Sequence, residues 1–349
     1  MQDLVRICSV GDLMLCDSPL NTGIGIGTQM ARKQVDYLKA VRPLLCGCDL
    51  AIGNLEGPIY QPKNNSLSEL QMSTNENSLL YLKQHNFGIL NIANNHCLQH
   101  GKDSFKNTIE SCLKYGIEPV GIYGQDFLRK KIKCFTISII ALSLRPEQFE
   151  SHNKEYEYRL DRIYKKINEE HENAKGNIII VSIHWGEEYM SFPSKKQIDI
   201  AHNMIDCGAR IILGHHSHVY QGIEKYKDGT IAYGQGNFIS DMFQEKSRQT
   251  GVLEIKVSSR TNISYEMHPY VINKSRLLVE SNINWHDERQ FDLMEKSNIA
   301  EEEYVAQVLQ SQEEYRNQYH RWFIKNFYRF PVKLSLESAL GAIKRRIRH

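Results

Sequence analysis

Five short apolar runs in this chain each end in residues that can bind a metal ion or transfer a proton. The runs cover residues 5–10, 50–53, 88–93, 178–183 and 210–213, and they lead into Gly11-Asp12, Asn54-Leu55-Glu56, Asn94-Asn95-His96, His184 and Gly214-His215-His216-Ser217-His218. Short apolar runs bounded by turn residues are typical of buried β-strands. In an open α/β sheet, the loops at the carboxyl ends of the strands form the ligand crevice. If these strands run parallel in one fold, the five polar clusters lie at one edge, and the sequence predicts a built site there.

Size and composition are compatible with such a fold. The 349 residues suffice for one large α/β domain with an appendage, and 41% hydrophobic with 24% charged residues is usual for a globular protein. The net charge of +2 gives no indication of a nucleic-acid partner, and none is expected. Apolar runs stay far below the roughly 20 residues that span a bilayer. The first residues lack the basic start of a signal peptide, so we expect a cytoplasmic protein.

The order of patterns indicates an α/β domain followed by a helical region. Helices are expected at residues 31–45, 78–84, 104–115, 150–176 and 194–206, and further strands at 132–144, 222–226, 230–233, 251–257 and 263–271. Strands that follow one another without helices suggest hairpins, so the sheet is expected to be mixed. Beyond residue 286 the sequence has no strand signal. We therefore divide the chain into a domain at residues 1–274 and a helical, basic, aromatic-rich region at residues 275–349.

Each candidate residue also has an ordinary explanation when it is taken alone. Asp12 could cap a turn, Glu56 could be solvated, and Asn95 with His96 could form a turn. His184 could be a hydrogen-bonded histidine of the core, although its place after so apolar a run suits a neutral imidazole bound to metal.

The histidine-rich segment at residues 214–218 carries the most weight. Two histidines separated by one residue on an extended loop can point to neighbouring positions around one site. The sequence leaves open whether His215 or His216 is the ligand. Asn237, in Gly236-Asn237-Phe238, could support the site by a hydrogen bond or could only set a turn.

The combined donor set consists of carboxylates, an amide and imidazoles, without a thiolate. This set suits Mn²⁺, Fe or Zn²⁺ better than a structural zinc ion. Two such ions about 3.5–4 Å apart clamp the attacking and leaving oxygens of a phosphoryl displacement. The residues therefore predict a metal-dependent hydrolase, with His96 as the candidate general acid.

The order of these motifs resembles the CapA family of capsule-synthesis, poly-γ-glutamate-type proteins, a branch of the calcineurin-like metallophosphatase superfamily. The resemblance runs from about residue 5 to residue 245. It is carried by six motifs, namely Gly11-Asp12-Leu13-Met14-Leu15, Asn54-Leu55-Glu56-Gly57-Pro58, Ala93-Asn94-Asn95-His96, His184-Trp185-Gly186-Glu187-Glu188-Tyr189, Gly214-His215-His216-Ser217-His218-Val219 with Gln221, and Gly236-Asn237-Phe238.

The resemblance implies a four-layer α/β/β/α metallophosphatase fold with two metal ions and a role in capsular or extracellular polymer biosynthesis. By position, Asp12 and His218 would hold the first ion and Glu56 would bridge the two. Asn95, His184 and His216 would hold the second ion. His96 would protonate the leaving group, and His215 or Asn237 would support the ligands.

Two positions depart from the pattern. The wider superfamily has Asp-x-His in its first motif, whereas this chain has Met14, so we expect the first ion to bind weakly. Relatives tend to carry an Asp three residues after His96, where this chain has Gln99. These departures keep open the alternative of a catalytically idle scaffold of a polysaccharide assembly complex. A separate alternative is a metal-dependent γ-glutamyl amide hydrolase or transferase that uses the same site.

The C-terminal region is basic and aromatic. From residue 316 onward it has nine Lys or Arg against the single acid Glu337, with interleaved Tyr, Trp and Phe residues. Such a segment can lie as a peripheral contact on the inner, anionic membrane surface, or it can bind an anionic polymer or phosphorylated substrate. We favour a third interpretation, in which its aromatic residues pack on the catalytic domain and its basic face is solvated.

Overall fold

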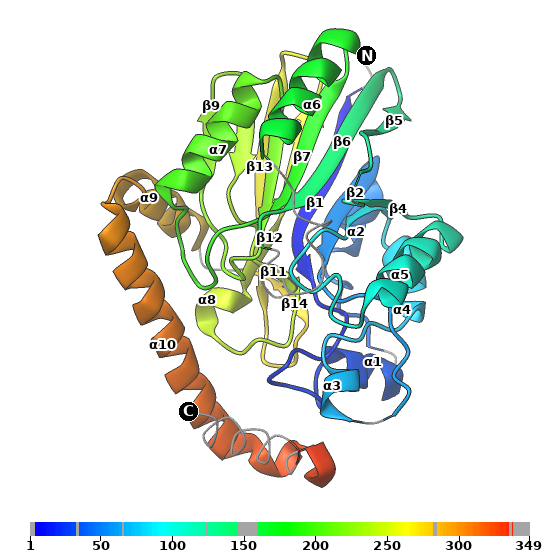
Figure 1. The fold of residues 1–349 in the computed structure, drawn as a ribbon, viewed down its shortest axis with the longest axis vertical. Coiled ribbons are helices and arrows are strands. Elements are labelled where there is room, and N and C mark those ends of the chain that lie inside the picture. The colour runs from blue at the N-terminus through cyan, green and yellow to red at the C-terminus, as the bar shows by residue number, and fades with distance from the viewer. Residues whose placement is uncertain are drawn as a thin grey trace.

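Two β-sheets lie face to face in the computed structural model, with helices on their outer sides (Figure 1). The structure describes residues 4–32, 35–64, 66–122, 124–145, 160–281, 285–334 and 337. The described strands are β1 (Val5–Leu13), β2 (Leu50–Leu55), β3 (Phe87–Asn91), β4 (Glu118–Val120), β5 (Leu128–Ile132), β6 (Phe135–Ser143), β7 (Ile178–His184), β8 (Ile211–His215), β9 (Ile223–Tyr226), β10 (Gly229–Ala232), β11 (Asn237–Ile239), β12 (Gln249–Val257), β13 (Ile263–Ile272) and β14 (Leu278–Glu280).

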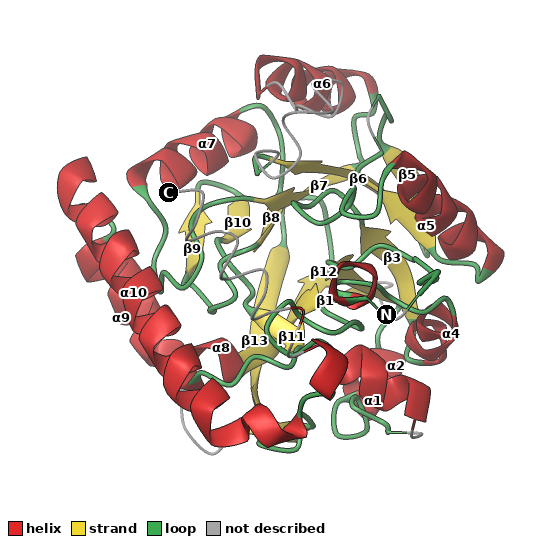
Figure 2. Cartoon of the chain, turned by 60° about the horizontal axis from the view of Figure 1, so that its bottom comes forward, coloured by secondary structure: helices red, strands yellow, loops and turns green. Residues whose placement is uncertain are grey.

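Helices surround the strands (Figure 2). They are α1 (Ile26–Arg32), α2 (Arg42–Gly47), α3 (Leu67–Leu70), α4 (Asn77–Gln84), α5 (Lys102–Lys114), α6 (Leu160–Asn173), α7 (Lys195–Asp206), α8 (Glu245–Arg248), α9 (Trp285–Lys296), α10 (Glu301–Asn326) and the 3₁₀ turn η3 (Phe327–Arg329). Among these described helices, none is long and apolar enough to cross a membrane.

Both sheets are mixed, as the sequence predicts. The first has the order β14-β13-β12-β1-β2-β3-β4, with β11 also paired to β1. Its strands β1, β2, β3 and β4 run parallel, and β12, β13 and β14 add antiparallel pairs. The second has the order β5-β6-β7-β8-β10-β9, parallel from β6 to β10 with an antiparallel strand at each edge.

Alternating side chains build three apolar layers. In β1, Val5 and Ile7 face the second sheet, where they meet residues such as Ile180 and Ile211. The neighbouring positions Cys8 and Val10 face the opposite way, toward a cluster that includes residues of α4 and α5. Period-two alternation of this kind is what a strand needs to contact two layers at once.

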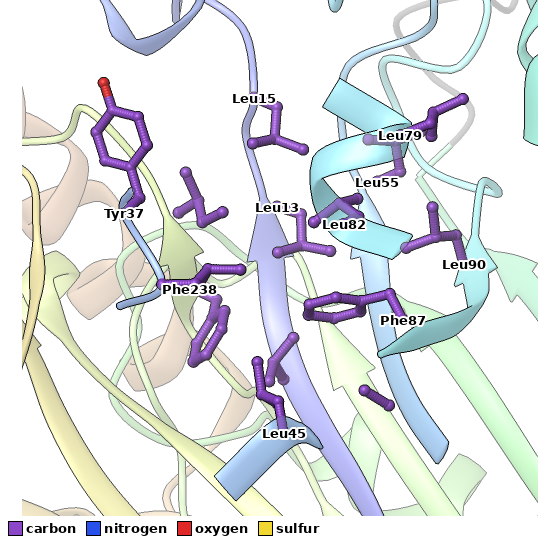
Figure 3. Close-up of a cluster of buried hydrophobic side chains, with 14 of the residues drawn as sticks. Leu13, Leu15, Tyr37, Leu45, Leu55, Leu79, Leu82, Phe87, Leu90 and Phe238 are labelled. Carbon is purple, nitrogen blue, oxygen red and sulfur yellow. The ribbon is translucent and has the colours of Figure 1, made fainter. Parts of the chain in front are cut away.

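The outer layers complete a four-layer α/β/β/α sandwich. On the first sheet, Leu13 and Phe87 pack against Leu79 and Leu82 of α4 (Figure 3). On the second sheet, a separate cluster joins its outer face to α6 and α7. The fold class that the sequence predicts is therefore confirmed.

The prediction of a single helix at residues 31–45 is wrong. The structure has two short helices there, α1 ending at Arg32 and α2 beginning at Arg42, and residues 33–34 lie outside the described part. Pro43 stands in the first turn of α2 instead of disturbing a helix end. A proline is favoured in that turn because the amide hydrogen it lacks would have no partner there in any case.

Two other expected segments need smaller corrections. The strand expected at residues 132–144 is present as β6 at Phe135–Ser143, whereas Ile132 ends β5, which pairs antiparallel with β6 across a turn where Lys133 has a positive φ of 53°. The helix expected at residues 150–176 is described from residue 160 as α6, and its earlier part falls outside the described residues.

The C-terminal helices lie along one flank of the molecule (Figure 2). The proposed boundary at residue 274 falls in the turn between β13 and β14, and β14 still pairs with the first sheet. In α10, Tyr304 and Val308 pack on Met190 and Phe192. This contact agrees with the favoured interpretation that aromatic residues hold the helical region on the domain.

Candidate metal centre

The strand register brings polar residues of the first sheet into one row. Asp12 in β1 stands opposite Asn54 in β2 and Asn237 in β11, and Asn54 stands opposite Asn91 in β3. These four residues are fully buried. In a parallel sheet, a shared register places such residues at the same carboxyl edge.

The second sheet contributes histidines at its own edge. His184, the last residue of β7, stands opposite His215, the last residue of β8. Two hydrogen bonds join the sheets near this level. Asn91 Nδ2 donates to Ser182 Oγ at 3.0 Å, and Asn95 Oδ1 lies 2.9 Å from His184 Nε2.

Glycines allow the backbone segments to approach closely here. A Cβ atom at Gly11 would lie 2.0 Å from the carbonyl oxygen of Gly236, and one at Gly214 would lie 1.9 Å from that of Tyr233. Any larger residue at either place would push β11 or β10 away from its neighbouring strand. The glycines before Asp12 and His215 thus have a structural reason.

The turn after β8 holds two histidines in an uncommon backbone conformation. His216 has φ 91° and His218 has φ 54°. Positive φ in non-glycine residues costs on the order of 1–3 kcal/mol and is concentrated at functional sites. The strained turn directs both rings toward the carboxylates of the first sheet.

Asp12, Glu56 and His218 form the first group of donor atoms, which lie within 4.8 Å of one another. His218 Nδ1 lies 3.3 Å from Asp12 Oδ2, and His218 Nε2 lies 3.5 Å from Glu56 Oε1. Asn237 Oδ1 lies 3.0 Å from His218 Nδ1 and accepts its hydrogen. That hydrogen bond leaves the Nε2 lone pair facing Glu56, as a metal ligand requires.

Glu56, His184 and His216 form the second group, again within 4.8 Å. The rings of His184 and His216 have centroids 4.7 Å apart. Glu56 belongs to both groups, which is the position of a bridging carboxylate. Asn95 reaches the second group through its contact with His184.

The structure distinguishes His215 from His216. His216 joins groups with Glu56 and His184, and with Glu188 and His218. Nδ1 of His215 instead lies 3.5 Å from Asp12 Oδ1. We propose His216 as the ligand and His215 as a residue that orients Asp12.

Several buried polar atoms of the site have no hydrogen-bond partner among the described residues, and this shows whether the site fits a cation. Both carboxylate oxygens of Glu56 and both ring nitrogens of His216 are buried without a hydrogen-bond partner in the part of the chain that the structure describes. An isolated buried carboxylate is costly, and such charges are normally paired or bound to metal. The residues present fit a divalent cation.

The electrostatics of the histidines agree with this donor set. Burial lowers the pKa of His184 and of His216 well below the usual value for histidine. Both imidazoles are therefore neutral at pH 7, and neutral imidazole is the form that binds metal.

The protonation of Glu56, Asp12 and His218 is linked, because their charges lie close together. Burial raises the pKa of Glu56 well above its ordinary value. Burial also acts against ionisation of Asp12, but His215 and His218 outweigh it and hold the pKa of Asp12 well below its usual range. For His218, burial is outweighed by Glu56 and Asp12, which raise its pKa to about 10. A proton on His218 and a divalent cation are alternative ways to balance these buried carboxylates.

His96 stands beside the cluster with a fixed ring. Its Nδ1 donates to Gln99 Oε1 at 2.6 Å, and its backbone amide donates to Asn94 Oδ1 at 3.0 Å. Gln99 thus supplies the acceptor that an aspartate supplies in the family pattern, although without a negative charge. Burial lowers the pKa of His96 below that of a free histidine.

Met14 has an apolar role. It is buried in a sulfur-rich cluster with Cys16 and Met72, against which Met242 packs. Ser240 Oγ lies 3.6 Å from its sulfur atom. The position that holds a histidine in the wider superfamily is therefore part of the packing here.

Sequence reasoning missed two contributors. Asn54 Nδ2 donates to Asp12 Oδ1 at 2.9 Å and lies 3.4 Å from His184 Nδ1, so it connects the two groups. Glu188, which is not among the candidate ligands expected from the sequence, forms a donor group with His216 and His218. Asn54 could have been found from the sequence, because it lies two positions before the candidate ligand Glu56. Glu188 could not, because only the folding of its loop brings it close to the histidines.

Comparison with known proteins identifies the family. Residues 6–242 match the family described as bacterial capsule synthesis protein PGA_cap, which is more than half of the chain. The chain belongs to this family. The PGA_cap match contains every donor residue described above and ends before α9 and α10.

Two curated PGA_cap relatives extend this finding. The PGA biosynthesis protein CapA of Bacillus subtilis is 28% identical over 290 residues, which cover 78% of this chain and 73% of that protein. The capsule biosynthesis protein CapA of Bacillus anthracis is 29% identical over 265 residues, which cover 70% of this chain and 62% of that protein. The chain therefore matches less than two thirds of the second relative's length.

Among solved structures, the chain is similar to the NAD nucleotidase NadN of Haemophilus influenzae. The sequence identity is 14%, the TM-score is 0.47, and the match covers 91% of this chain and 60% of that chain.

Proposed function

We propose that this PGA_cap protein is a metal-dependent hydrolase, with phosphoesterase-like chemistry, that acts in the biosynthesis of a capsular or extracellular polymer. The observation that carries the proposal is the buried carboxylate of Glu56, which accepts no hydrogen bond from the described residues and belongs to two groups of histidine and carboxylate donors. The family and its CapA relatives support the biological process.

The residues would hold the ions in two sets that share Glu56. Asp12 and His218 would hold the first ion, and Asn95, His184 and His216 would hold the second. Divalent Mn, Fe or Zn ions in such a site polarise a substrate oxygen and activate water at neutral pH. With Met14 unable to serve as the expected ligand, we propose that the first ion binds more weakly.

The other residues orient these groups. Asn237 fixes the ring of His218, Asn54 fixes Asp12, and Gln99 fixes His96. With Nδ1–H donated to Gln99, His96 would transfer a proton to a leaving oxygen from Nε2 only in its doubly protonated imidazolium form. Burial lowers the pKa of His96 and so disfavours that form. A general acid in this place contributes about 10²–10⁴-fold in rate.

The test compares two chromogenic substrates, a phosphate ester that releases p-nitrophenolate and a γ-glutamyl amide that releases p-nitroaniline. Purified protein with Mn²⁺ is given p-nitrophenyl phosphate and γ-glutamyl p-nitroanilide, alongside His96→Ala and His184→Ala variants. Mn²⁺-dependent release from the phosphate, lost in His184→Ala, is the expected result. Release only from the anilide would favour an amide hydrolase, and no release from either substrate would favour an idle scaffold.

For the end of α10, we propose peripheral contact with an anionic membrane surface. Ile324, Phe327, Tyr328 and Val332 are exposed apolar residues there. Basic residues accompany them, namely Arg321, Lys325, Arg329 and Lys333. Apolar and basic side chains on one short segment are the combination that binds an interface.

A further inference from the structure

A cavity of about 580 Å³ lies between the loop after β11, the β13–β14 turn and the end of α10. Cavities of this size hold small ligands or single units of a longer one. Four of its lining residues are cations, namely Arg248, Lys274, Arg276 and Arg329. The lining contains one carboxylate, that of Asp241.

These cations have no acidic partner in the described ranges of the chain. Arg248 and Arg276 donate only to backbone carbonyl groups, those of Ile272 at 3.4 Å and Ile24 at 2.6 Å. Arg329 donates to the amide oxygen of Asn326 at 3.3 Å, a neutral acceptor.

The single carboxylate is already occupied. Asp241 is buried, and its oxygens accept hydrogen bonds from Asn21 Nδ2 at 3.1 Å and the Ser18 amide at 3.3 Å. It forms no ion pair with the cavity cations in the described part of the structure. Most other Arg and Lys contacts in the fold do include a carboxylate, as for Arg6 with Glu254 and Lys133 with Asp49.

Hydrogen bonds within the β13–β14 turn fix the backbone that carries Lys274 and Arg276. Asn273 Oδ1 accepts from the amides of Ser275 and Leu277, at 2.8 and 3.1 Å. Arg276 adopts a positive φ of 66° within this turn. The strained conformation and the asparagine together hold the turn in one form.

The cavity adjoins the metal centre through one residue. Met242 lines the cavity, and its sulfur accepts a hydrogen bond from Asn237 Nδ2 at 3.3 Å. Asn237 Oδ1 in turn lies 3.0 Å from His218 Nδ1. One layer of side chains therefore separates the basic cavity from the proposed metal ligands.

An aromatic row leads along the same path. Tyr189, whose ring centroid is 6.3 Å from that of His218, stacks on Tyr315 at 4.1 Å. Phe243 follows Tyr315 at 6.2 Å and stacks on Trp322 at 5.2 Å, and both of these residues line the cavity. The row of rings thus extends from the metal centre to the cavity.

We propose that this cavity binds the oxyanion groups of an acidic polymer chain while a neighbouring unit of the same chain lies at the metal centre. Unpaired guanidinium and ammonium groups bind carboxylates or phosphates by charge-assisted hydrogen bonds, and they gain nothing from a neutral chain. The polymer as substrate rests on the proposed function, whereas the anion site rests on the cavity itself. The cavity would thereby select polymers with repeated negative charges.

The test measures binding of two oligoanions by titration calorimetry at low salt. The probes are hexaglutamate for carboxylates and tripolyphosphate for phosphates. The protein is first stripped of metal ions with EDTA, and the EDTA, itself a polycarboxylate, is removed by gel filtration before the titration. The cavity variant is Lys274→Gln with Arg329→Gln, two exposed side chains whose loss leaves the core intact. The matched control is Lys246→Gln with Arg316→Gln, which removes the same charge from exposed positions of α8 and α10 outside the cavity.

Wild type is expected to bind at least one probe, and the cavity variant to bind it about tenfold more weakly or less. The control should stay within about twofold of wild type. The preferred probe identifies the oxyanion as carboxylate or phosphate. Absence of binding to wild type, or equal weakening in both variants, would overturn the proposal.

A His184→Ala, His216→Ala variant separates this proposal from the proposed function. It should lose the metal site and still bind the oligoanion after metal ions and EDTA have been removed. If metal binding and hydrolysis fail while the oligoanion still binds, only the proposed function is refuted. If hydrolysis succeeds and the oligoanion does not bind, only the anion site is refuted.

Discussion

Oδ1 of Asn95 lies 2.9 Å from Nε2 of His184, although 89 positions separate the two residues in the chain. Asn95 follows β3 of the first sheet, and His184 ends β7 of the second. The candidate metal centre therefore lies at the seam between the sheets. Neither sheet alone presents the complete donor set, so the site depends on their packing.

Replacing Asn95 by alanine should weaken metal binding without unfolding the protein. The change removes one proposed ligand and the hydrogen bond that orients His184, and a loss of about 10–100-fold in affinity is expected. Competition with a chromophoric chelator measures it. Asn317→Ala, at an exposed position of α10, is the control and should keep the affinity of wild type. An unchanged affinity in the Asn95 variant would remove this residue from the site.

Metal should stabilise wild type but not Glu56→Gln. In EDTA the glutamine variant should melt no lower than wild type, because burial already disfavours the charged form of Glu56 and its oxygens accept no hydrogen bond from the described residues. A free ion at about 100 times its Kd adds about 2.7 kcal/mol to wild type, which raises Tm by about 3 °C or more. Differential scanning calorimetry with and without Mn²⁺ measures both effects.

Glu245→Gln on α8 is the control for this measurement, because its side chain is exposed and lies outside the donor groups. It should respond to Mn²⁺ like wild type. A Glu56→Gln variant that gained the same stability from Mn²⁺ would contradict the bridging position of Glu56.

The strand ends that form the site could be predicted because a buried apolar run followed by a polar residue is a local signal. The choice between His215 and His216 could not, since it depends on positive φ values in a turn whose neighbours come from the other sheet. The inward position of Glu188 likewise depends on loop packing. The helix expected at residues 31–45 failed because a proline can begin a helix as well as end one.

The basic cavity had only a partial signal in the sequence. The excess of Lys and Arg after residue 316 is visible, but Lys274 and Arg276 lie on a turn far away in the chain. Lys274 and Arg276 come close to Arg329 only because the end of α10 packs beside that turn. Tertiary neighbourhoods of this kind have no fixed spacing along the chain.

Because of Glu170, the free energy of unfolding should decrease as the pH becomes acidic. It is buried, and it accepts hydrogen bonds from Ser138 at 2.6 Å, from Asn177 at 3.1 Å and from Arg129 at 2.9 Å. Burial opposes its charge, but these donors outweigh burial and lower its pKa below the ordinary value. The folded state therefore gains stability above the unfolded pKa of about 4.3 and loses it as pH falls through the lower folded value.

Urea unfolding at pH 7 and at pH 4 should show a smaller loss for Glu170→Gln than for wild type. The glutamine variant should be less stable at pH 7, because it loses charge-assisted bonds. Glu169→Gln, at the exposed neighbouring position, should follow wild type at both pH values. An equal acid loss in wild type and Glu170→Gln would show that other groups govern this behaviour.

The membrane proposal predicts flotation with anionic vesicles. Wild type should float with phosphatidylglycerol vesicles at low salt, less so at high salt, and not with phosphatidylcholine alone. Phe327→Ser with Tyr328→Ser should reduce flotation, whereas Leu309→Ser, an exposed apolar change earlier on α10, should not. Failure of wild type to float on anionic vesicles at low salt would end this proposal.

Metal content is the most direct test of the site. Wild type, His184→Ala with His216→Ala, and His268→Ala are purified together and measured by mass spectrometry after exposure to Mn²⁺, Fe²⁺ and Zn²⁺. His268 belongs to a separate acidic group with Glu254 and Glu266, so its variant controls for incidental binding. Wild type and His268→Ala should each hold about one to two ions per chain, and the double variant should lose at least the ion held by His184 and His216. Equal metal content in all three proteins would contradict the metal centre.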